Sequence, residues 1–225
     1  WTRTSDWNVT RTALSGDGVH DAYGTAVAVE GSTVCVSGYY YDGSKDIPCV
    51  WIGGSRTDLG QYPVAGGRAM GVAIVGGVVY VGGYHYALRP QGGSVQIPCY
   101  WIDGVRTDLQ GYDDTDSAGN PAFDGLNDYG AYVWSITVDG GEVYTAGRVH
   151  DGVSNFKACN WRGAARTELS NGALDANAIC ITVSGGIVYT GGHYLSSTYV
   201  PCYWTGTART DLPTYSPTND GRVYA

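Results

Sequence analysis

Short apolar runs alternate with small and polar residues along the chain, and glycine separates many of these runs. Residues 72–75 read Val-Ala-Ile-Val, a Gly-Gly pair follows at 76–77, and a second apolar run with a tyrosine occupies 78–82. Two β-branched runs joined by two glycines are typical of a β-hairpin. Because the pattern has no helical periodicity, it predicts an all-β protein and argues against an α/β fold.

The hairpin belongs to a longer unit that occurs four times. A strand containing tryptophan follows each hairpin, and a short Gly-containing turn then leads to Arg-Thr-Asp/Glu-Leu. The unit is a few tens of residues long and contains four short strands, which predicts the blades of a β-propeller. We expect blades near 26–59, 72–109, 133–169 and 178–212, with innermost strands near 26–29, 72–75, 135–138 and 180–183.

The two ends of the chain bear on how the propeller closes. Residues 220–225 resemble the start of a second strand, and residues 1–14 carry a third- and fourth-strand pattern. Residues 213–225 and 1–14 would then share a fifth blade, which removes exposed sheet edges. We expect a single propeller domain over 1–225 with five blades. Four blades plus flanking strands is the alternative, which Pro217 favours because proline disrupts an inner strand.

The sequence of the unit resembles that of a known group. Its hairpin reads approximately Gly-Gly-x-Val-Tyr-Val-x-Gly, and Pro-Cys-Tyr-Trp-x-x-Gly-x-Arg-Thr-Asp-Leu follows. This resembles the bacterial secreted kelch-like β-propeller repeat proteins over almost the whole chain. It departs from kelch because Tyr100 and Trp101 are adjacent and the diglycine is not kept in every unit. The resemblance implies a propeller outside the cell or on the cell surface, and it transfers no catalytic motif.

The net charge and the composition limit the classes of partner that we expect for this protein. The formal net charge is −8, which argues against nucleic acid or an anionic membrane surface as a partner. No apolar run approaches the roughly 20 residues of a membrane helix, so we expect no membrane insertion. Two lysines among many Tyr, Thr, Ser and Gly residues favour an extracellular protein. We expect protein partners or self-association, with a glycan as a further possibility.

Residues that recur in every unit serve the unit, because one active site cannot be built four or five times. We therefore predict that the repeated tryptophans pack between blades and that the repeated arginines pair with an acid or carbonyl of a neighbouring blade. The candidate partners, which could alternatively stabilise turns, are Asp58, Asp108, Glu168 and Asp211. The predicted structural residues are Trp7, Trp51, Trp101, Trp161, Trp204, Arg11, Arg56, Arg106, Arg166 and Arg209.

The cysteines fall into two groups. Cys49, Cys99, Cys159 and Cys202 share one repeated position and are interpreted as small buried residues. Cys35 instead replaces a tyrosine of the other units. If Ser37 pairs with Ile47, Cys35 lies opposite Cys49, and the sequence then predicts a Cys35–Cys49 disulfide. Cys180 has no obvious mate.

Tyrosine and histidine gather in the predicted loops that lead into and out of the strands. Tyrosine offers a flat apolar ring and a hydroxyl group, which suit both sugars and protein surfaces. The alternative is that these tyrosines only cover the strand ends. The predicted ligand-binding face consists of Tyr39, Tyr40, Tyr84, His85, Tyr86, His150, His193, Tyr194 and Tyr132.

An acidic insertion is the only candidate metal site. Asp114 and Asp116, followed by a glycine, weakly resemble a calcium loop. Ala118 stands where an oxygen ligand is expected and no glutamate closes the loop, so a solvated insertion is favoured. We expect no cofactor, with calcium as the alternative.

These observations favour a non-catalytic extracellular or cell-surface propeller that serves as an interaction or assembly module. One form that such a module could take is a unit of a larger array or filament. The first alternative is a lectin-like carbohydrate binder that uses the Tyr/His-rich face. The second is a secreted glycosidase or lyase, which requires two carboxylates on the substrate face. No pair stands out among the candidates for that role, which are Asp21, Asp124, Asp128 and Asp175.

Overall fold

The computed structural model describes residues 13–14, 19–60, 66–88, 93–111, 130–150, 155–214 and 221–223. These residues form strands and turns, with no helix among them. The strands form four antiparallel sheets of four strands each. The prediction of an all-β protein is confirmed.

Each sheet is built from four strands that follow one another along the chain. The first sheet contains β1 (Ala22–Glu30), β2 (Thr33–Tyr41), β3 (Asp46–Ile52) and β4 (Ser55–Asp58). The second contains β5 (Gly67–Val75), β6 (Val78–Leu88), β7 (Ser94–Ile102) and β8 (Val105–Asp108). The third contains β9 (Tyr132–Asp139), β10 (Glu142–His150), β11 (Phe156–Arg162) and β12 (Ala165–Glu168). The fourth contains β13 (Ala176–Ser184), β14 (Ile187–Leu195), β15 (Tyr199–Thr205) and β16 (Ala208–Asp211).

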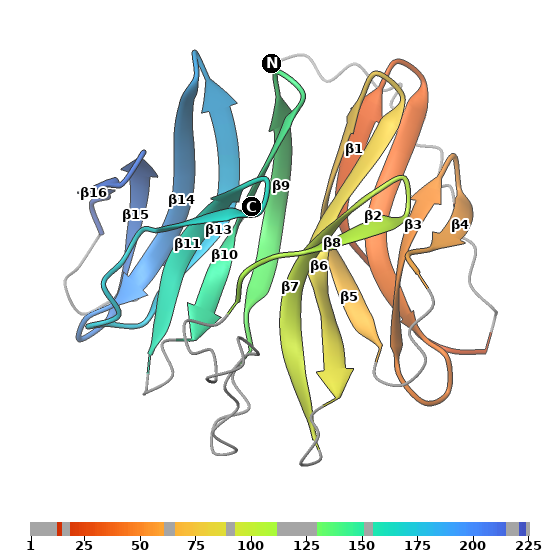
Figure 1. The fold of residues 1–225 in the computed structure, drawn as a ribbon, viewed down its shortest axis with the longest axis horizontal. Helices are drawn as coiled ribbons and strands as arrows, with labels where there is room; N and C mark the ends of the chain where they lie inside the picture. The colour runs from red at the N-terminus through yellow and green to blue at the C-terminus, as the bar shows by residue number, and fades with distance from the viewer. Residues whose placement is uncertain are drawn as a thin grey trace, which may run out of the picture.

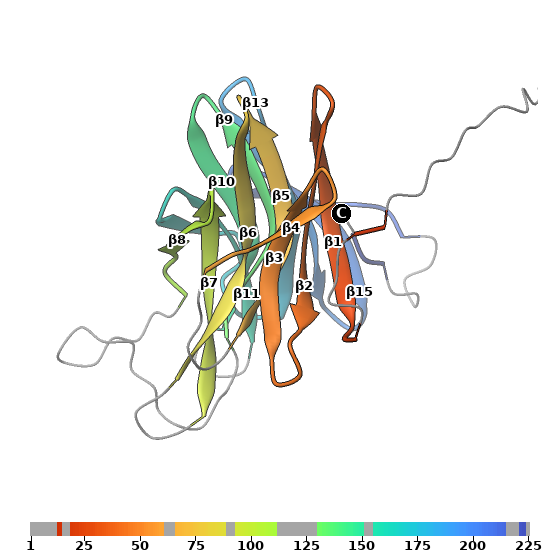
Figure 2. The same cartoon turned by 90° about the vertical axis from the view of Figure 1, so that its right-hand side faces the viewer.

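The sheets lie next to one another in chain order, as Figure 1 shows. The first strand of each later sheet contacts the first three strands of the sheet before it: β5 contacts β1, β2 and β3, and β9 contacts β5, β6 and β7. β13 contacts β9, β10 and β11 in the same way. This repeated stacking is a propeller-like arrangement, in which β1, β5, β9 and β13 are the innermost strands (Figure 2). All four predicted innermost strands lie within them.

The hairpin turns follow from the glycine pairs. Gly76 and Gly77 have φ values of 60° and 81°, which place both residues in the left-handed region required by a type I′ turn. The carboxylate of Glu30 in the first sheet accepts both of their backbone N–H groups, each at 2.7 Å. The turn of one sheet is therefore also held by its neighbour.

Tryptophan fills the space between neighbouring sheets. Trp51, Trp101, Trp161 and Trp204 are buried at the equivalent place in the four sheets. Trp101 shares a buried cluster with residues of the first sheet, Trp161 with residues of the second, and Trp204 with residues of the third. The Trp161 indole Nε1 also donates a hydrogen bond of 3.1 Å to the backbone oxygen of Gln110, just after the second sheet. Trp7 and Arg11 lie outside the described residues.

Each innermost strand contains a β-bulge. The strand pairing skips one residue per strand, namely Thr25, Met70, Trp134 and Ile179. All four line one cavity of about 510 Å³, which is bordered by all four innermost strands. Because a bulge redirects the extra side chain, the four bulges place one side chain of each sheet in the cavity.

Candidate functional site

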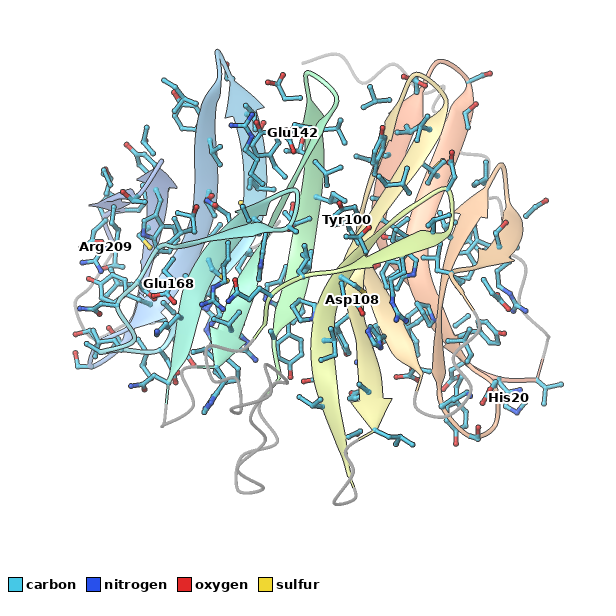
Figure 3. All side chains as sticks on the ribbon, in the orientation of Figure 1. His20, Tyr100, Asp108, Glu142, Glu168 and Arg209 are labelled. Carbon is cyan, nitrogen blue, oxygen red and sulfur yellow. The ribbon has the colours of Figure 1, made fainter. Side chains whose placement is uncertain are left out.

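The residues of the predicted ligand-binding face lie in strands. The sequence interpretation placed most of them in loops, but the second strands continue to Tyr41, Leu88, His150 and Leu195 and include them. Tyr132 is the first residue of β9. His85, His150 and His193 are buried, whereas His20 is exposed and lies at the edge of the molecule in Figure 3. The prediction that all four histidines lie in loops is therefore wrong for three of them.

One subset of these residues pairs with the outer strand of its own sheet. The Tyr40 hydroxyl donates to Asp58 Oδ2 at 3.0 Å, and the Tyr194 hydroxyl donates to Asp211 Oδ2 at 3.1 Å. In the second sheet His85 takes this position, and its Nε2 lies 3.1 Å from Asp108 Oδ1. These polar groups are used inside the sheets, so their repeated geometry supports a structural role.

The repeated arginines contact the acid two residues further along the same strand. The N–O distances are 3.1 Å for Arg56–Asp58, 2.7 Å for Arg106–Asp108, 3.1 Å for Arg166–Glu168 and 2.9 Å for Arg209–Asp211. Asp108, Glu168 and Arg209 are labelled in Figure 3. The acids are the predicted candidate partners, but they belong to the same sheet as their arginine and not to a neighbouring one. Two residues apart on a strand, the side chains share one face and can meet.

These contacts change the acidity of Asp108. Burial alone would raise its pKa, but the hydrogen bond from His85 and the charges of His85 and Arg106 together hold the pKa below its usual value. The Asp108 carboxylate is thus stabilised in its charged form. A group of this kind stabilises the outer strand and is poorly suited to act as a general acid.

A second subset forms a line of aromatic rings, which we name the aromatic belt: Tyr84, Tyr132, Trp134, His150 and Phe156. Tyr132 contacts Tyr84 with ring centroids 5.1 Å apart, and it stacks on Trp134 at 5.3 Å with an interplanar angle of 2°. Phe156 lies 6.3 Å from Tyr132 and 5.1 Å from His150. The belt therefore joins the second sheet to the third.

Arg148 lies inside the belt. Its guanidinium carbon is 3.8 Å from the centroid of Phe156 and 4.8 Å from that of Tyr132, and its Nη1 donates to Asn177 Oδ1 at 3.0 Å. Burial lowers the pKa of Arg148. Cation–π contacts of this kind are strongest where the cation is removed from water.

The predicted ligand-binding face did not include Arg148 or Trp134. Arg148 follows Gly147, and the strand pairing places it at the position occupied by Tyr39, Tyr84 and His193 in the other sheets. An alignment of the units on this glycine would have singled out Arg148 as the one cation. Trp134 would have required recognition of the bulge.

His193 extends this region into the fourth sheet. Its ring lies 5.3 Å from that of Tyr199, and its Nε2 is 3.4 Å from Asn177 Nδ2. Burial and the nearby cations Arg222 and Arg148 lower the pKa of His193. The imidazole therefore remains neutral to a lower pH than a free histidine.

The predicted Cys35–Cys49 disulfide is wrong. Ser37 pairs with Val50 and not with Ile47, so Cys35 lies opposite Ile52 and Cys49 lies opposite Gly38. Both cysteines are free and buried. Cys99, Cys159 and Cys202 are buried too, in accordance with their interpretation as small buried residues, and burial raises the pKa of Cys49 and Cys202 to about 12.

The described part of the chain adds little support for the two remaining candidates, a metal site and a pair of catalytic carboxylates. Asp114 and Asp116, the weak calcium candidates, lie outside it, as do Asp124 and Asp128. Within the described residues, no group of three or more His, Cys, Asp or Glu side chains is placed to hold a metal ion. Asp175 accepts a hydrogen bond from the backbone of Phe156 at 2.7 Å. The part of the chain that the structure describes contains no helix long and apolar enough to cross a membrane.

Comparison with known proteins returned no match, either to a protein-family model or to a curated protein.

Proposed function

We propose that this chain is a non-catalytic interaction or assembly module, built as a propeller with a fifth blade position between its fourth and first sheets. The observation that supports this proposal most strongly is a pair of exposed apolar faces, one on each of those sheets. The kelch-like resemblance and a location outside the cell or on its surface are part of the same hypothesis.

The first exposed face belongs to the first sheet and consists of Val27, Val29 and Val34; we name it the first-sheet face. The side chain of Val27 is 64% exposed. At the equivalent position, Val72, Ile136 and Ile181 are only 6 to 9% exposed, because the preceding sheet covers them. The first-sheet face thus corresponds to a surface that is wholly or partly covered in the other three sheets.

The second exposed face belongs to the fourth sheet and contains Tyr203 and Leu212; we name it the fourth-sheet face. Tyr203 is 37% exposed, whereas its equivalents in the other sheets are 3 to 8% exposed. Leu212 is 38% exposed, against 1 to 8% for Leu59, Leu109 and Leu169. The following sheet covers these equivalents, so the two faces are the two halves of one sheet–sheet interface.

Described residues near the C-terminus reach the fourth sheet as a further inner strand would. The backbone N–H of Gly221 donates to the oxygen of Tyr199 at 2.8 Å, and Ala131 donates to the equivalent oxygen of Gln96 at 3.2 Å. Ala131 directly precedes β9, an innermost strand. The sequence interpretation compared this segment with the start of a second strand, and its contacts instead match those before a first strand.

Val223 and Leu14 support the same fifth position from its two sides. Val223 Cγ1 lies 3.5 Å from the place of a Cβ atom on Gly191, as Val133 of the next sheet lies against the equivalent Gly82. Leu14 Cδ1 lies 3.8 Å from the place of a Cβ atom on Gly24. Five blades with contributions from both ends therefore remain our preferred arrangement, and four blades with flanking strands is the alternative.

Analytical ultracentrifugation over a range of concentrations tests whether the exposed faces mediate association. We expect the wild-type chain to associate as its concentration rises, and Val27→Asp to stay monomeric because a charge in the interface is costly. Val105→Asp is the matched control, since Val105 is 72% exposed on the outer strand β8. A wild-type chain that stays monomeric, or equal association of both variants, would contradict self-assembly through these faces.

A lectin-like function is the second candidate, and the aromatic belt is the observation that favours it. Stacked aromatic rings beside a guanidinium group offer the apolar and polar contacts that a sugar needs. A glycan array combined with Trp134→Ala tests this candidate: a signal that is lost in the variant supports it, and the absence of any signal counts against it. A hydrolysis screen on the same glycans tests the glycosidase or lyase alternative.

A further inference from the structure

The fifth position accepts a specific type of partner. We propose that it binds a β-hairpin of this chain's own repeat type, donated by another polypeptide chain. This inference rests on the proposed function, because it identifies the partner of the two exposed faces.

The sheet–sheet contacts define what covers the first-sheet face. In the second sheet, the equivalent residues Val72 and Val79 share a buried cluster with Cys35 of β2, and Ala28 of β1 packs against it. In the third sheet, Tyr80 of β6 and Ala73 of β5 pack against the cluster of Ile136 and Val143. The covering surface thus always includes the inner hairpin of the preceding sheet, through small residues on its first strand and mostly tyrosine on its second, and a third-strand residue and a leucine complete it.

The same contacts define what meets the fourth sheet. A Cβ atom on Gly82 in the second sheet would lie 2.7 Å from Val133 Cγ1 and 3.3 Å from Ile136 Cβ, both on β9. On the fourth sheet, the equivalent Gly191 borders a small apolar pocket of about 260 Å³, which Cys180 and Tyr203 also line. The matching ligand surface is therefore a first strand that presents β-branched residues.

One element has both surfaces, namely the inner hairpin of a unit. Its first strand presents Val or Ile towards the sheet before it, and the small and tyrosine side chains cover the sheet after it. The sequence contains four such hairpins, and all four are already paired inside the four sheets. None of these four hairpins is therefore free to fill the fifth position of its own copy.

The geometry of the free surface fits a hairpin better than a second copy of the whole chain. Val223 and Leu14 already occupy the margins of the fifth position. Direct stacking of the fourth sheet of one copy on the first sheet of another, which is the self-association tested above, requires Val223 and Leu14 to move, so we expect it to be weaker than hairpin binding. A hairpin extends the contacts that Val223 begins and leaves Leu14 in place.

The hairpin between β9 and β10 provides a probe. We would prepare residues 136–150 as a labelled peptide and close it into a ring through a second Asn-Gly turn, because a free hairpin is marginally stable in water. Fluorescence anisotropy then measures its binding to the full-length protein. We expect saturable binding, weakened about tenfold or more by Val27→Asp or by Tyr203→Ser and unchanged by Val105→Asp. A ring with Ile136→Asp and Tyr144→Ser is the matched control peptide.

Circular dichroism of each variant shows that a loss of binding is not a loss of folding, and the two exposed faces are altered separately so that one misfolded variant does not decide the result. No saturable binding to the folded wild-type chain, or equal binding of the control ring, overturns the hairpin proposal. Concentration-dependent association without peptide binding would leave the assembly proposal standing and refute this one. Peptide binding to a chain that stays monomeric would support the hairpin proposal and contradict self-assembly.

Discussion

Trp161 and Trp204 occupy the same position in neighbouring units, and both are completely buried. Only the Trp161 indole donates a hydrogen bond, to Gln110, whereas Trp204 Nε1 has no partner among the described residues. Two identical substitutions can therefore separate the hydrogen bond from the packing. We expect Trp161→Phe to reduce the free energy of unfolding by about 1 kcal/mol more than Trp204→Phe does.

Chemical denaturation of the two variants measures this difference. Both lose similar volume, so the loss of packing largely cancels in the comparison. A Trp204→Phe variant that is as unstable as Trp161→Phe would show that the bond to Gln110 contributes nothing net.

His193 gives the second prediction at the residue scale. Its pKa in the folded protein lies below the unfolded value of about 6.5, so the unfolded chain takes up a proton first as the pH falls. The contribution of the neutral His193 imidazole to the free energy of unfolding is therefore fully present above about pH 6.5 and decreases below it. We expect His193→Gln to make this decrease shallower, as measured by urea denaturation from about 1 pH unit above the unfolded pKa to about 1.5 units below it.

His20→Gln is the control for this pH dependence, because His20 is exposed. Its stability curve should follow that of the wild-type chain. If His20→Gln changed the slope and His193→Gln did not, the buried imidazole would not be the group responsible.

The hairpin turns carry the prediction at the scale of elements. Gly77 has a φ of 81°, a conformation that alanine adopts only with strain and asparagine tolerates better. No heavy atom lies within 4 Å of the place of a Cβ atom on Gly77, so the backbone conformation alone should determine the cost. We expect Gly77→Ala to destabilise the protein by about 1 kcal/mol and Gly77→Asn by clearly less, in thermal or urea unfolding.

Equal losses in the two variants would point to an effect other than φ, such as the hydrogen bonds from the turn to Glu30. Glu30→Gln separates this contribution, since it keeps the shape of the side chain and removes its charge.

The elements themselves could be predicted from the sequence because each is a local pattern. The Val-Ala-Ile-Val run and the Gly-Gly pair at 76–77 define one hairpin without help from the rest of the chain. The Cys35–Cys49 pairing failed because it depends on the register between β2 and β3, which the loop between them sets. A shift of three residues moved Cys35 to a position opposite Ile52.

The candidate site was harder to predict than the strands. Tyr84 and Tyr132 could be selected from their types, but their ring contact joins residues 48 positions apart through the stacking of two sheets. Trp134 enters the cavity because a bulge redirects it, and a bulge leaves no clear sequence signal here. Arg148 was detectable only by comparing the units position by position.

At the scale of the whole molecule, stability should depend on how far the proposed fifth position is occupied. Three sheet–sheet interfaces are buried, and the first-sheet and fourth-sheet faces form the surfaces of a fourth interface that remains exposed. In a stack of repeats each unit is stabilised mainly by its neighbours, so the first and fourth sheets should be the least stable. Hydrogen exchange should be faster in β13 and β14 than in β9 and β10.

Val223 tests the contribution of the fifth position within the chain itself. Its side chain lies beside Gly191 of the fourth sheet, where the other sheets receive the first strand of the next one. Replacing Val223 by Thr keeps the shape and the β-branch but places a hydroxyl group against an apolar surface, which costs about 1 kcal/mol. For a chain of this length we expect the melting temperature to fall by about 2–4 °C. Val105→Thr, an identical change on an exposed strand, should leave the melting temperature nearly unchanged.

If the hairpin ring binds as proposed, it should raise the melting temperature of the wild-type chain more than that of Val223→Thr, because the bound hairpin continues the packing that Val223 begins. Equal melting temperatures for Val223→Thr and the wild-type chain would mean that the C-terminal contact is incidental, and the case for a fifth blade would then rest on the two exposed faces alone.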